Sequence, residues 1–512
     1  MSKTKISFLL NLAFFLLALC SATDANAQKQ EPTPLPSPSP AAKAAQQTTP
    51  QTQAAGKNPI IIIPGIQGSQ LVNSKTGKSV WFEVRREKDD DLRLPMTSAI
   101  LSRNRDGVVA KDIIREVKLP GVLPDLEVYQ GLIDSLKARG YAEADWTKPQ
   151  ATDVFYVFPY DWRRDNVETA RLLIQKIEAV KRSVKRPDLK FDILAHSMGG
   201  LIARYAAMYG TADLLPEGRK PVPTWTGARH INKLLMFGTP NEGSFDAFSA
   251  LINGSSVVST RNLPFIDDFR PEDGLTSPSI FQLMPHQTAV RFLDENLKPL
   301  KIDLYNPATW SKYGWGALND PKFLGKLKDA DLLAKENKDI RPSKLGKDAN
   351  FDDKVLSQTT FAQVRAYFSA VLNRAKRFNL ALDAPTRKSP ILLYAYGGNC
   401  QPTLDAVLLV HSDKKDRWLT ITDARDIKTS GGREIKKDEL KAVMFTLGDG
   451  RVTKRSLLAE GEASEGGTKE LISAFPLKSS VFGCSLHTQL FLEKNIQDSF
   501  LSALVIEKTK QP

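Results

Sequence analysis

Residues 191–205 read FDILAHSMGGLIARY and decide how the rest of the chain is interpreted. The first four residues, apolar except for Asp192, are typical of a buried strand, and the residues after the second glycine have helical spacing up to Gly210. Between them, AHSMG follows the pattern Gly-x-Ser-x-Gly, with Ala195 in place of the first glycine. This pattern is typical of a sharp strand-to-helix turn that exposes a serine hydroxyl. Ser197 is therefore the candidate nucleophile, and the alternative is a serine in an ordinary turn.

Four more apolar runs share the character of the one before Ser197. Unbroken runs of this kind indicate strands buried on both faces, and alternation with helices, as at 167–182, implies parallel pairing. The sequence therefore predicts an α/β fold with a mostly parallel sheet and helices on both faces. The four runs are Ile60–Ile63, Val154–Phe158, Ile231–Phe237 and Ile391–Gly397.

The alternation stops after Pro240 and resumes only at Ile391. The interval holds short amphipathic pieces with many prolines and charges, so we interpret 241–389 as a large cap or lid insertion on the sheet. The core is then predicted in two parts, 58–240 and 390–512. In the second part we expect a hairpin around Lys414-Lys415, a core strand at AVMFTL (442–447), and a last helix from about Thr488 to Val505.

The N-terminus has the features of an export signal. Two lysines precede the apolar stretch Ile6–Cys20, which is shorter than the roughly 20 residues of a membrane span, and a small-residue Ala-Asn-Ala site follows it. We predict a signal peptide over 1–27 and a Pro/Ala/Gln-rich linker over 28–57. Lipidation of Cys20 is the alternative. The mature chain is expected to be periplasmic or secreted, to have no transmembrane segment, and to contact membranes only peripherally.

Composition excludes several classes of protein. With 512 residues, 41% of them hydrophobic and 25% charged, the chain is globular rather than disordered or collagen-like. A net charge of +13 can favour anionic lipid, acidic cell wall or nucleic acid. The lysines and arginines are scattered among acidic residues, however, so we interpret them as a solvated surface and expect no nucleic-acid partner.

A nucleophilic serine needs a general base, and the base needs an acid that orients it. In chains with this serine pattern the partners follow in the order serine, acid, histidine. Of the five histidines, His487 is the one that lies late in the chain, just before the predicted last helix. Asp405 opens a strand, Asp423 follows a hairpin strand, and Asp449 follows AVMFTL between two glycines. Because sites in parallel sheets lie at the carboxyl ends of strands, we predict Asp449 as the acid.

A tetrahedral intermediate on Ser197 would also need backbone N–H donors for its oxyanion. One is expected from Met198, directly after the serine. The other is expected from the loop PGIQG after the first strand, with Ile66 as first choice and Gln67 as second. A phosphate-binding loop is the alternative, but no Lys-Ser/Thr follows the glycines.

Two cysteines, Cys400 and Cys484, remain once the signal is removed. In an oxidising compartment such a pair is more often a disulfide than two free thiols, so we predict a bridge that pins the His487 segment to the sheet. No His/Cys cluster has the spacing of zinc ligands, and we predict neither a metal nor a cofactor.

With these residues in place, the chain resembles the lecithin:cholesterol acyltransferase family of α/β-hydrolases, which includes lysosomal phospholipase A and phospholipid:diacylglycerol acyltransferases. The matching motifs occur in family order over about 58–500, and the segment FPYDWR and the loop PGxxGSxL are more discriminating than the serine pattern. The motifs are IIIIPGIQGSQL, VWFE, FPYDWRRDN, AHSMGG, FGTPNEGS, DLYNPATW, YGGNCQPT, LGDGRV and the His487 segment.

The resemblance implies the α/β-hydrolase fold and an acyl-serine that is formed from a lipid ester and passed to water or an alcohol. It also implies a lid through which a lipid chain enters. The family's triad falls on Ser197, Asp449 and His487, its oxyanion hole on Ile66 and Met198, and its disulfide on Cys400 and Cys484.

Two departures from the family pattern stand out. Ala195 replaces the first glycine of the Gly-x-Ser-x-Gly pattern. The chain also has no cysteine after the PG loop, where animal members have another disulfide in the region that contacts membranes. Trp81-Phe82 could contribute an apolar contact with lipid there.

The leading hypothesis is an exported serine acyl hydrolase or O-acyltransferase that acts on phospholipid or another glycerolipid at a membrane or lipid surface. The alternatives are a general carboxylesterase or lipase for a non-phospholipid ester, and a non-catalytic binding protein on a hydrolase fold. A large apolar insertion favours long acyl chains, because burying each CH₂ contributes about 0.8 kcal/mol. The full set of serine, acid, histidine and oxyanion loop argues against the binding protein.

Overall fold

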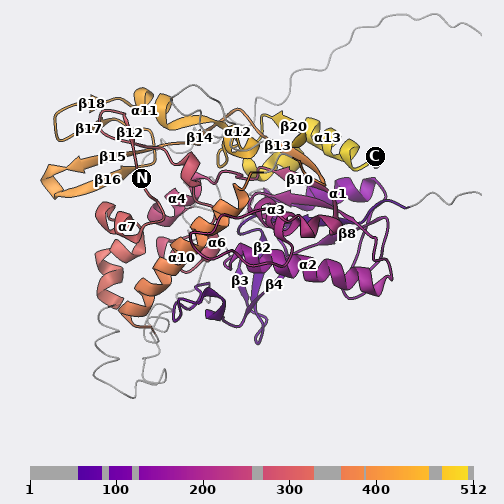
Figure 1. Ribbon diagram of the computed structural model, residues 1–512. Coiled ribbons are helices and arrows are strands. Elements are labelled where there is room, and N and C mark those ends of the chain that lie inside the picture. Colours follow the sequence, from indigo (N-terminus) through magenta and orange to yellow (C-terminus); the bar gives the residue numbers. More distant parts are fainter. Residues whose placement is uncertain are drawn as a thin grey trace, which may run out of the picture. The chain divides into compact units, whose positions relative to one another are not determined.

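The computed structural model contains a seven-stranded sheet in the order β20-β13-β10-β9-β1-β8-β7, four strands of which, β20, β13, β10 and β8, are labelled in Figure 1. All neighbouring strands in it are parallel, which confirms the predicted α/β class. In chain order the strands are β1 Ile60–Ile63, β7 Ala142–Glu143, β8 Val154–Val157, β9 Phe191–His196, β10 Ile231–Phe237, β13 Leu392–Gly398 and β20 Leu477–Gly483. The structure describes residues 56–83, 92–117, 126–255, 269–327, 359–385, 388–460 and 476–505.

Helices cover both faces of this sheet. Alternate residues of a strand point to opposite faces, so Ile61 and Ile63 of β1 contact one set of helices and Ile60 and Ile62 the other. The first face packs against α2 (Asn166–Ser183) and α3 (Met198–Tyr209). The second face packs against α1 (Gln130–Ala138) and α13 (Lys494–Val505).

Strand β1 is the point at which the chain changes direction across the sheet. It pairs with β8 on one side and with β9 on the other, so the chain crosses β1 between these two strands. Ligand sites in open α/β sheets form outside the carboxyl ends of strands at such a switch point. The loop after β1 and the turn after β9 both lie at this edge, which is where the sequence predicted the oxyanion loop and Ser197.

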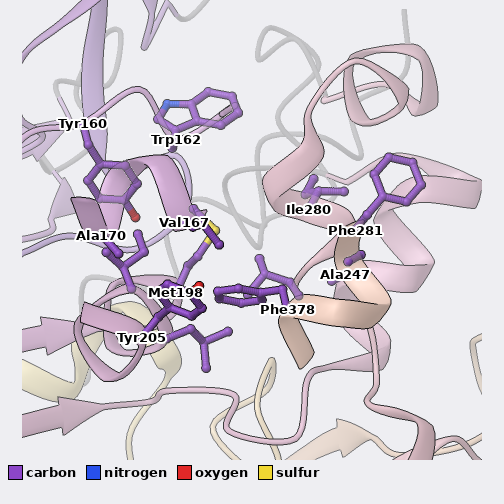
Figure 2. Close-up of a cluster of buried hydrophobic side chains, with 14 of the residues drawn as sticks. Tyr160, Trp162, Val167, Ala170, Met198, Tyr205, Ala247, Ile280, Phe281 and Phe378 are labelled. Carbon is purple, nitrogen blue, oxygen red and sulfur yellow. The ribbon is translucent and has the colours of Figure 1, made fainter. Parts of the chain in front are cut away.

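The segment between β10 and β13 packs on α3 through its long helix α10 (Phe361–Leu382), and its other described helices join the same apolar cluster. Figure 2 shows Met198 and Tyr205 of α3 close to Phe378, with Ala247, Ile280 and Phe281 further along the same apolar cluster. The rings of Tyr205 and Phe378 stack with centroids 5.6 Å apart. The helices of this segment are α4 Phe245–Asn253, α5 Pro271–Leu275, α6 Pro278–Phe281, α7 Pro307–Tyr313 and α10 Phe361–Leu382.

The remaining strands form small sheets. A three-stranded sheet in the order β3-β2-β4 follows β1, and a four-stranded sheet in the order β12-β11-β15-β16 contains the hairpin expected around Lys414. Their bounds are β2 Ser69–Asn73, β3 Ser79–Trp81, β4 Val108–Ile113, β5 Glu116–Val117, β6 Leu126–Glu127, β11 Phe292–Leu293, β12 Pro299–Leu300, β14 Gln401–Leu404, β15 Val407–Ser412, β16 Arg417–Ile421, β17 Ile427–Lys428, β18 Glu434–Ile435 and β19 Phe445–Gly448. Short helices α11 (Lys437–Met444) and α12 (Lys454–Leu458) flank β19.

Two expectations for the second half of the core are wrong. AVMFTL is not a strand of the main sheet, because its first residues end helix α11, which buries Leu440 and Met444 one turn apart. Only β19 is extended, and it pairs with β14 instead. The last helix does not begin at Thr488 either, since a 3-10 helix, η7 (His487–Leu492), precedes α13.

Residues 56–512 form one compact unit. The predicted signal peptide 1–27, with Cys20, and residues 28–55 of the predicted linker lie outside the described residues, as do parts of the predicted insertion. Within the part of the chain that the structure describes, no helix is both long enough and apolar enough to cross a membrane.

Candidate active site

Ser197 lies on the sharp turn that joins β9 to α3. Its backbone has φ 51° and ψ −124°, a conformation that costs a residue other than glycine about 1–3 kcal/mol. The Ser197 N–H donates to the carbonyl of Phe237 at 2.7 Å, so β10 holds the turn in place. Only glycine fits at position 200, because a Cβ there would lie 1.9 Å from Oγ1 of Thr239. Strain at a serine between a strand and a helix is the geometry of a nucleophile elbow.

His487 and Asp449 form a buried hydrogen-bonded pair. Nδ1 of His487 lies 2.7 Å from Oδ2 of Asp449, and the His487 N–H donates to the Asp449 carbonyl at 2.9 Å. The other carboxylate oxygen, Oδ1, accepts the backbone N–H groups of Arg451 at 3.0 Å and Val452 at 2.7 Å. The carboxylate is therefore fixed from both sides, and it orients the imidazole through Nδ1.

The other two candidate acids contact different partners. Asp405 pairs with Arg291 and Arg455, and Asp423 pairs with Arg425 at 3.0 Å. The structure thus brings Asp449 to His487 and leaves Asp405 and Asp423 in other ion pairs.

Asp449 contacts His487 from a turn outside the main sheet, whereas the sequence suggested the carboxyl end of a core strand. Its turn follows β19, outside the main sheet, and packs on the end of β13, where a Cβ on Gly398 would lie 2.8 Å from Cβ of Asp449. On the other side, a Cβ on Gly238, after β10, would lie 2.9 Å from both Oδ2 of Asp449 and Nδ1 of His487. Glycines at the ends of two neighbouring strands therefore make room for the pair.

Ser197 and His487 open into the same cavity, which has a volume of about 150 Å³. Most of its wall is apolar and comes from three parts of the chain: the sheet edge, the segment after β4, and helices α4 and α6. Asp246 of α4 and Arg451 of the acid turn meet in its wall as an ion pair of 2.7 Å. Apolar lining residues are Ile66, Phe82, Ile114, Val117, Ile280 and Leu283.

The loop after β1 turns tightly beside Ser197. Gly68 N–H donates to the Gly65 carbonyl at 3.1 Å, and a Cβ on Gly65 would lie 2.8 Å from Cβ of Ser197. Ile66 and Gln67, the two candidates for the second oxyanion donor, both line the cavity. Met198 is the first residue of α3, so its N–H is one of the helix N-terminal donors that have no acceptor within the helix.

The FPYDWR segment supports this loop from behind. The Tyr160 hydroxyl donates to the carbonyl of Pro64 at 2.9 Å, and Trp162 packs on Trp81 with centroids 5.3 Å apart. Trp81 Nε1 in turn donates to the carbonyl of Gln67 at 2.9 Å. Trp81 is 1% exposed, so it does not supply the contact with lipid that the sequence suggested. Its indole N–H donates to the loop after β1. Phe82 lines the cavity instead.

Two residues that the sequence analysis did not select also contact this site. His196 precedes the serine, and Tyr129 precedes α1; both are buried and both line the cavity. Burial and the neighbouring His487 lower the pKa of His196 to about 3, so its ring is neutral.

Cys400 and Cys484 form a disulfide with Cα atoms 5.2 Å apart. Cys400 follows β13 and Cys484 follows β20, just before His487. The bridge therefore ties the histidine turn to the neighbouring strand. Within the described ranges no group of three or more His, Cys, Asp or Glu side chains could hold a metal ion.

Replacing both cysteines by serine is expected to lower the free energy of unfolding by roughly 4–5 kcal/mol, because the bridge closes a loop between residues 84 positions apart. Thermal or urea unfolding of the chain that begins at Gln28 measures this loss. A thiol assay under denaturing conditions provides the control: it should detect no free thiol before reduction and two per chain afterwards. Two free thiols before reduction would contradict the bridge.

Comparison with known proteins shows a family model that matches part of the sequence and solved structures that share little sequence with this chain. No curated protein sequence matches it. Solved structures with a similar course include the Tle4–Tli4 complex, at 14% identity over 87% of this chain and 97% of that chain, with a TM-score of 0.46. The mature lipase BlEst2 of Bacillus licheniformis has 12% identity over 88% and 93% of the two chains, with a TM-score of 0.27. EstA of Clostridium botulinum has 11% identity over 89% and 88%, with a TM-score of 0.31.

Residues 74–322 match the family model described as lecithin:cholesterol acyltransferase. These residues include Ser197, the FPYDWR segment and the start of the segment between β10 and β13. Residues 74–322 of this chain therefore match the lecithin:cholesterol acyltransferase family, and the parallel sheet with helices on both faces is the α/β architecture that the resemblance implies.

Proposed function

We propose that this protein is an exported lipid acyl hydrolase or O-acyltransferase that works through an acyl-serine on Ser197. The observation that carries the proposal is a strained serine that shares an apolar cavity with a histidine bound to a buried aspartate. A serine alone is a weak nucleophile, and it is this combination with a base and an orienting acid that makes it reactive.

In the proposed mechanism, His487 takes the proton from the Ser197 hydroxyl while Oγ forms a bond to the ester carbonyl carbon. The carbonyl electrons move to its oxygen, which is stabilised by the N–H groups of Met198 and Ile66. The C–O bond of the ester then breaks, and His487 gives its proton to the leaving alkoxide. Asp449 stabilises the imidazolium that forms between these steps.

The acyl-serine is then attacked by water or by an alcohol, with His487 again taking the proton. The same intermediate serves hydrolysis and transfer, so the acceptor that reaches it decides the product. The apolar cavity wall supports a long acyl chain, since each buried CH₂ adds about 0.8 kcal/mol to binding. A phospholipid or another glycerolipid at a membrane or lipid surface is the substrate that we propose.

Export is part of the same proposal. The motif at 1–27 has the charge, length and small residues of a cleaved signal. The Cys400–Cys484 bridge fits an oxidising compartment such as the periplasm or the exterior.

The test uses mature protein from Gln28 with phospholipid vesicles that carry labelled acyl chains, with and without an added long-chain or sterol alcohol. Free fatty acid that appears with wild type and not with Ser197→Ala, and that alcohol does not change, would assign a phospholipase. Label in a new ester would assign an acyltransferase. Turnover of a short-chain ester without any action on vesicles would favour the general carboxylesterase and contradict the lipid substrate.

A further inference from the structure

A chain of buried hydrogen bonds connects the oxyanion loop to the histidine turn through two side chains. The N–H of Gly65 donates to the Tyr129 hydroxyl oxygen at 2.8 Å, and that hydroxyl lies 2.8 Å from Nδ1 of His196. Nε2 of His196 lies 3.0 Å from the backbone carbonyl of His487. The imidazoles of His196 and His487 are neighbours, with centroids 4.7 Å apart.

Only one arrangement of protons satisfies this chain. A backbone carbonyl can only accept, so Nε2 of His196 must carry a proton and donate to His487. In a neutral ring Nδ1 is then an acceptor, and the Tyr129 hydroxyl must donate to it. The hydroxyl oxygen is left to accept the Gly65 N–H, and each donor in this series of hydrogen bonds then has an acceptor.

The two ends of this series of hydrogen bonds, the oxyanion loop and the His487 turn, are the parts of the site that must be placed most accurately. Gly65 precedes Ile66 and is held at both of its backbone polar groups, because its N–H donates to Tyr129 and its carbonyl, which belongs to the peptide that carries the Ile66 N–H, accepts from Gly68 N–H at 3.1 Å. At the other end, the carbonyl of His487 is held by His196 while its N–H is held by Asp449. Ser197 itself follows His196 directly.

We propose that Tyr129 and His196 are positioning residues that set the oxyanion loop and the His487 turn at the correct distance from each other on either side of Ser197. The inference rests on the proposed function, because it assigns these two side chains a role in the same acyl transfer. Both ring nitrogens of His196 are occupied in the chain, so His196 is not itself the base. Loss of the Tyr129 hydroxyl would disconnect the loop while leaving the apolar cavity intact.

The test is Tyr129→Phe, which removes one oxygen and keeps the ring. We expect kcat for a short-chain nitrophenyl ester to fall about 10- to 100-fold, because misplacement of reacting groups by about 1 Å has an effect of this size. KM should change less than about twofold, since the cavity wall is kept. The inhibition constant of an alkyl boronic acid, which forms a tetrahedral adduct at an active serine, should rise by the same factor by which kcat falls.

Tyr367→Phe is the matched control. Tyr367 lies in α10, is fully buried, and its hydroxyl has no hydrogen-bond partner among the described residues, so its removal should leave kcat, KM and inhibition unchanged. Thermal unfolding and labelling of Ser197 by a fluorophosphonate measure the folded, reactive fraction of each variant, to which kcat is normalised.

The outcomes separate this inference from the proposed function. Equal kcat and boronate inhibition in the two Tyr→Phe variants would overturn the positioning role, and so would a loss of kcat fully explained by a smaller folded fraction. In both cases Ser197-dependent turnover of the wild type would leave the proposed function standing. A wild type without such turnover would overturn both.

Discussion

Replacing Ser197 by alanine is expected to lower kcat for any ester substrate by roughly 10⁶-fold, the size of loss found when a serine nucleophile is removed from an acyl-transfer site. His487 would keep its bond to Asp449 and the loop after β1 would keep its shape, but no atom would remain to form the acyl-enzyme. A small residual rate can persist, because oxyanion donors and substrate binding still act without the nucleophile. Substrate hydrolysis under saturating conditions measures the loss.

The fold should not change in this variant. Alanine tolerates the backbone conformation of Ser197, φ 51° and ψ −124°, no worse than serine does, and the N–H that bonds to Phe237 is retained. The unfolding midpoint should therefore match that of wild type and of Ser502→Ala, a control on the exposed side of α13. A fluorophosphonate should label wild type and the control but not Ser197→Ala. Substantial activity in Ser197→Ala would place the nucleophile elsewhere.

The first half of the core was predictable because its strands are buried on both faces. Such strands are continuous apolar runs, and β1, β8, β9 and β10 all lie within a residue or two of the predicted bounds. The serine turn was predictable for a related reason: the motif needs a strand before it and a helix after it, and both signals are present in 191–210. At this turn the serine motif and the secondary structure predicted on either side of it indicate the same geometry.

The second half was less predictable because its elements are only partly buried. Strand β20 lies at the edge of the sheet, and its residues Lys478, Ser479 and Ser480 are exposed, so it has no apolar run to mark it. Strand β19 exposes Leu447 at 57% and belongs to a two-stranded sheet. Asp449 was selected by its glycine-flanked turn and its order in the chain, and the structure brings it to His487 although its strand is not in the main sheet.

The Tyr129–His196 connection could not be predicted at all from local patterns. The two residues are 67 positions apart, and Tyr129 lies in a stretch with no motif. The one available signal was that His196 stands inside the serine motif, where burial of its ring demands two hydrogen-bond partners. Which residues supply them depends on how α1 and the His487 turn meet β9, and that is a property of the folded chain.

Replacing Asp449 by asparagine is expected to lower kcat about 10⁴-fold while KM changes little. Oδ1 of Asp449 accepts two backbone N–H groups, from Arg451 and Val452, so an asparagine at this position would place its only oxygen there. Its NH₂ would then face Nδ1 of His487 and make that nitrogen an acceptor, and the proton of the neutral ring would move to Nε2. An imidazole with Nε2 protonated cannot take the proton of Ser197, so the base would be lost although the structure is preserved.

Asp423→Asn is the matched control, because Asp423 pairs with Arg425 at the surface and should leave kcat within about twofold of wild type. Asp405→Asn tests the third candidate: it disrupts a largely buried pairing with Arg291 and Arg455, so it should lower the unfolding midpoint while the folded fraction keeps its kcat. Measuring kcat per folded molecule therefore separates an orienting acid from a structural one. If Asp405→Asn or Asp423→Asn lost more activity per folded molecule than Asp449→Asn, the acid would have to be reassigned, since the hydrogen bond at Nδ1 would then not be the one that sets the tautomer of His487.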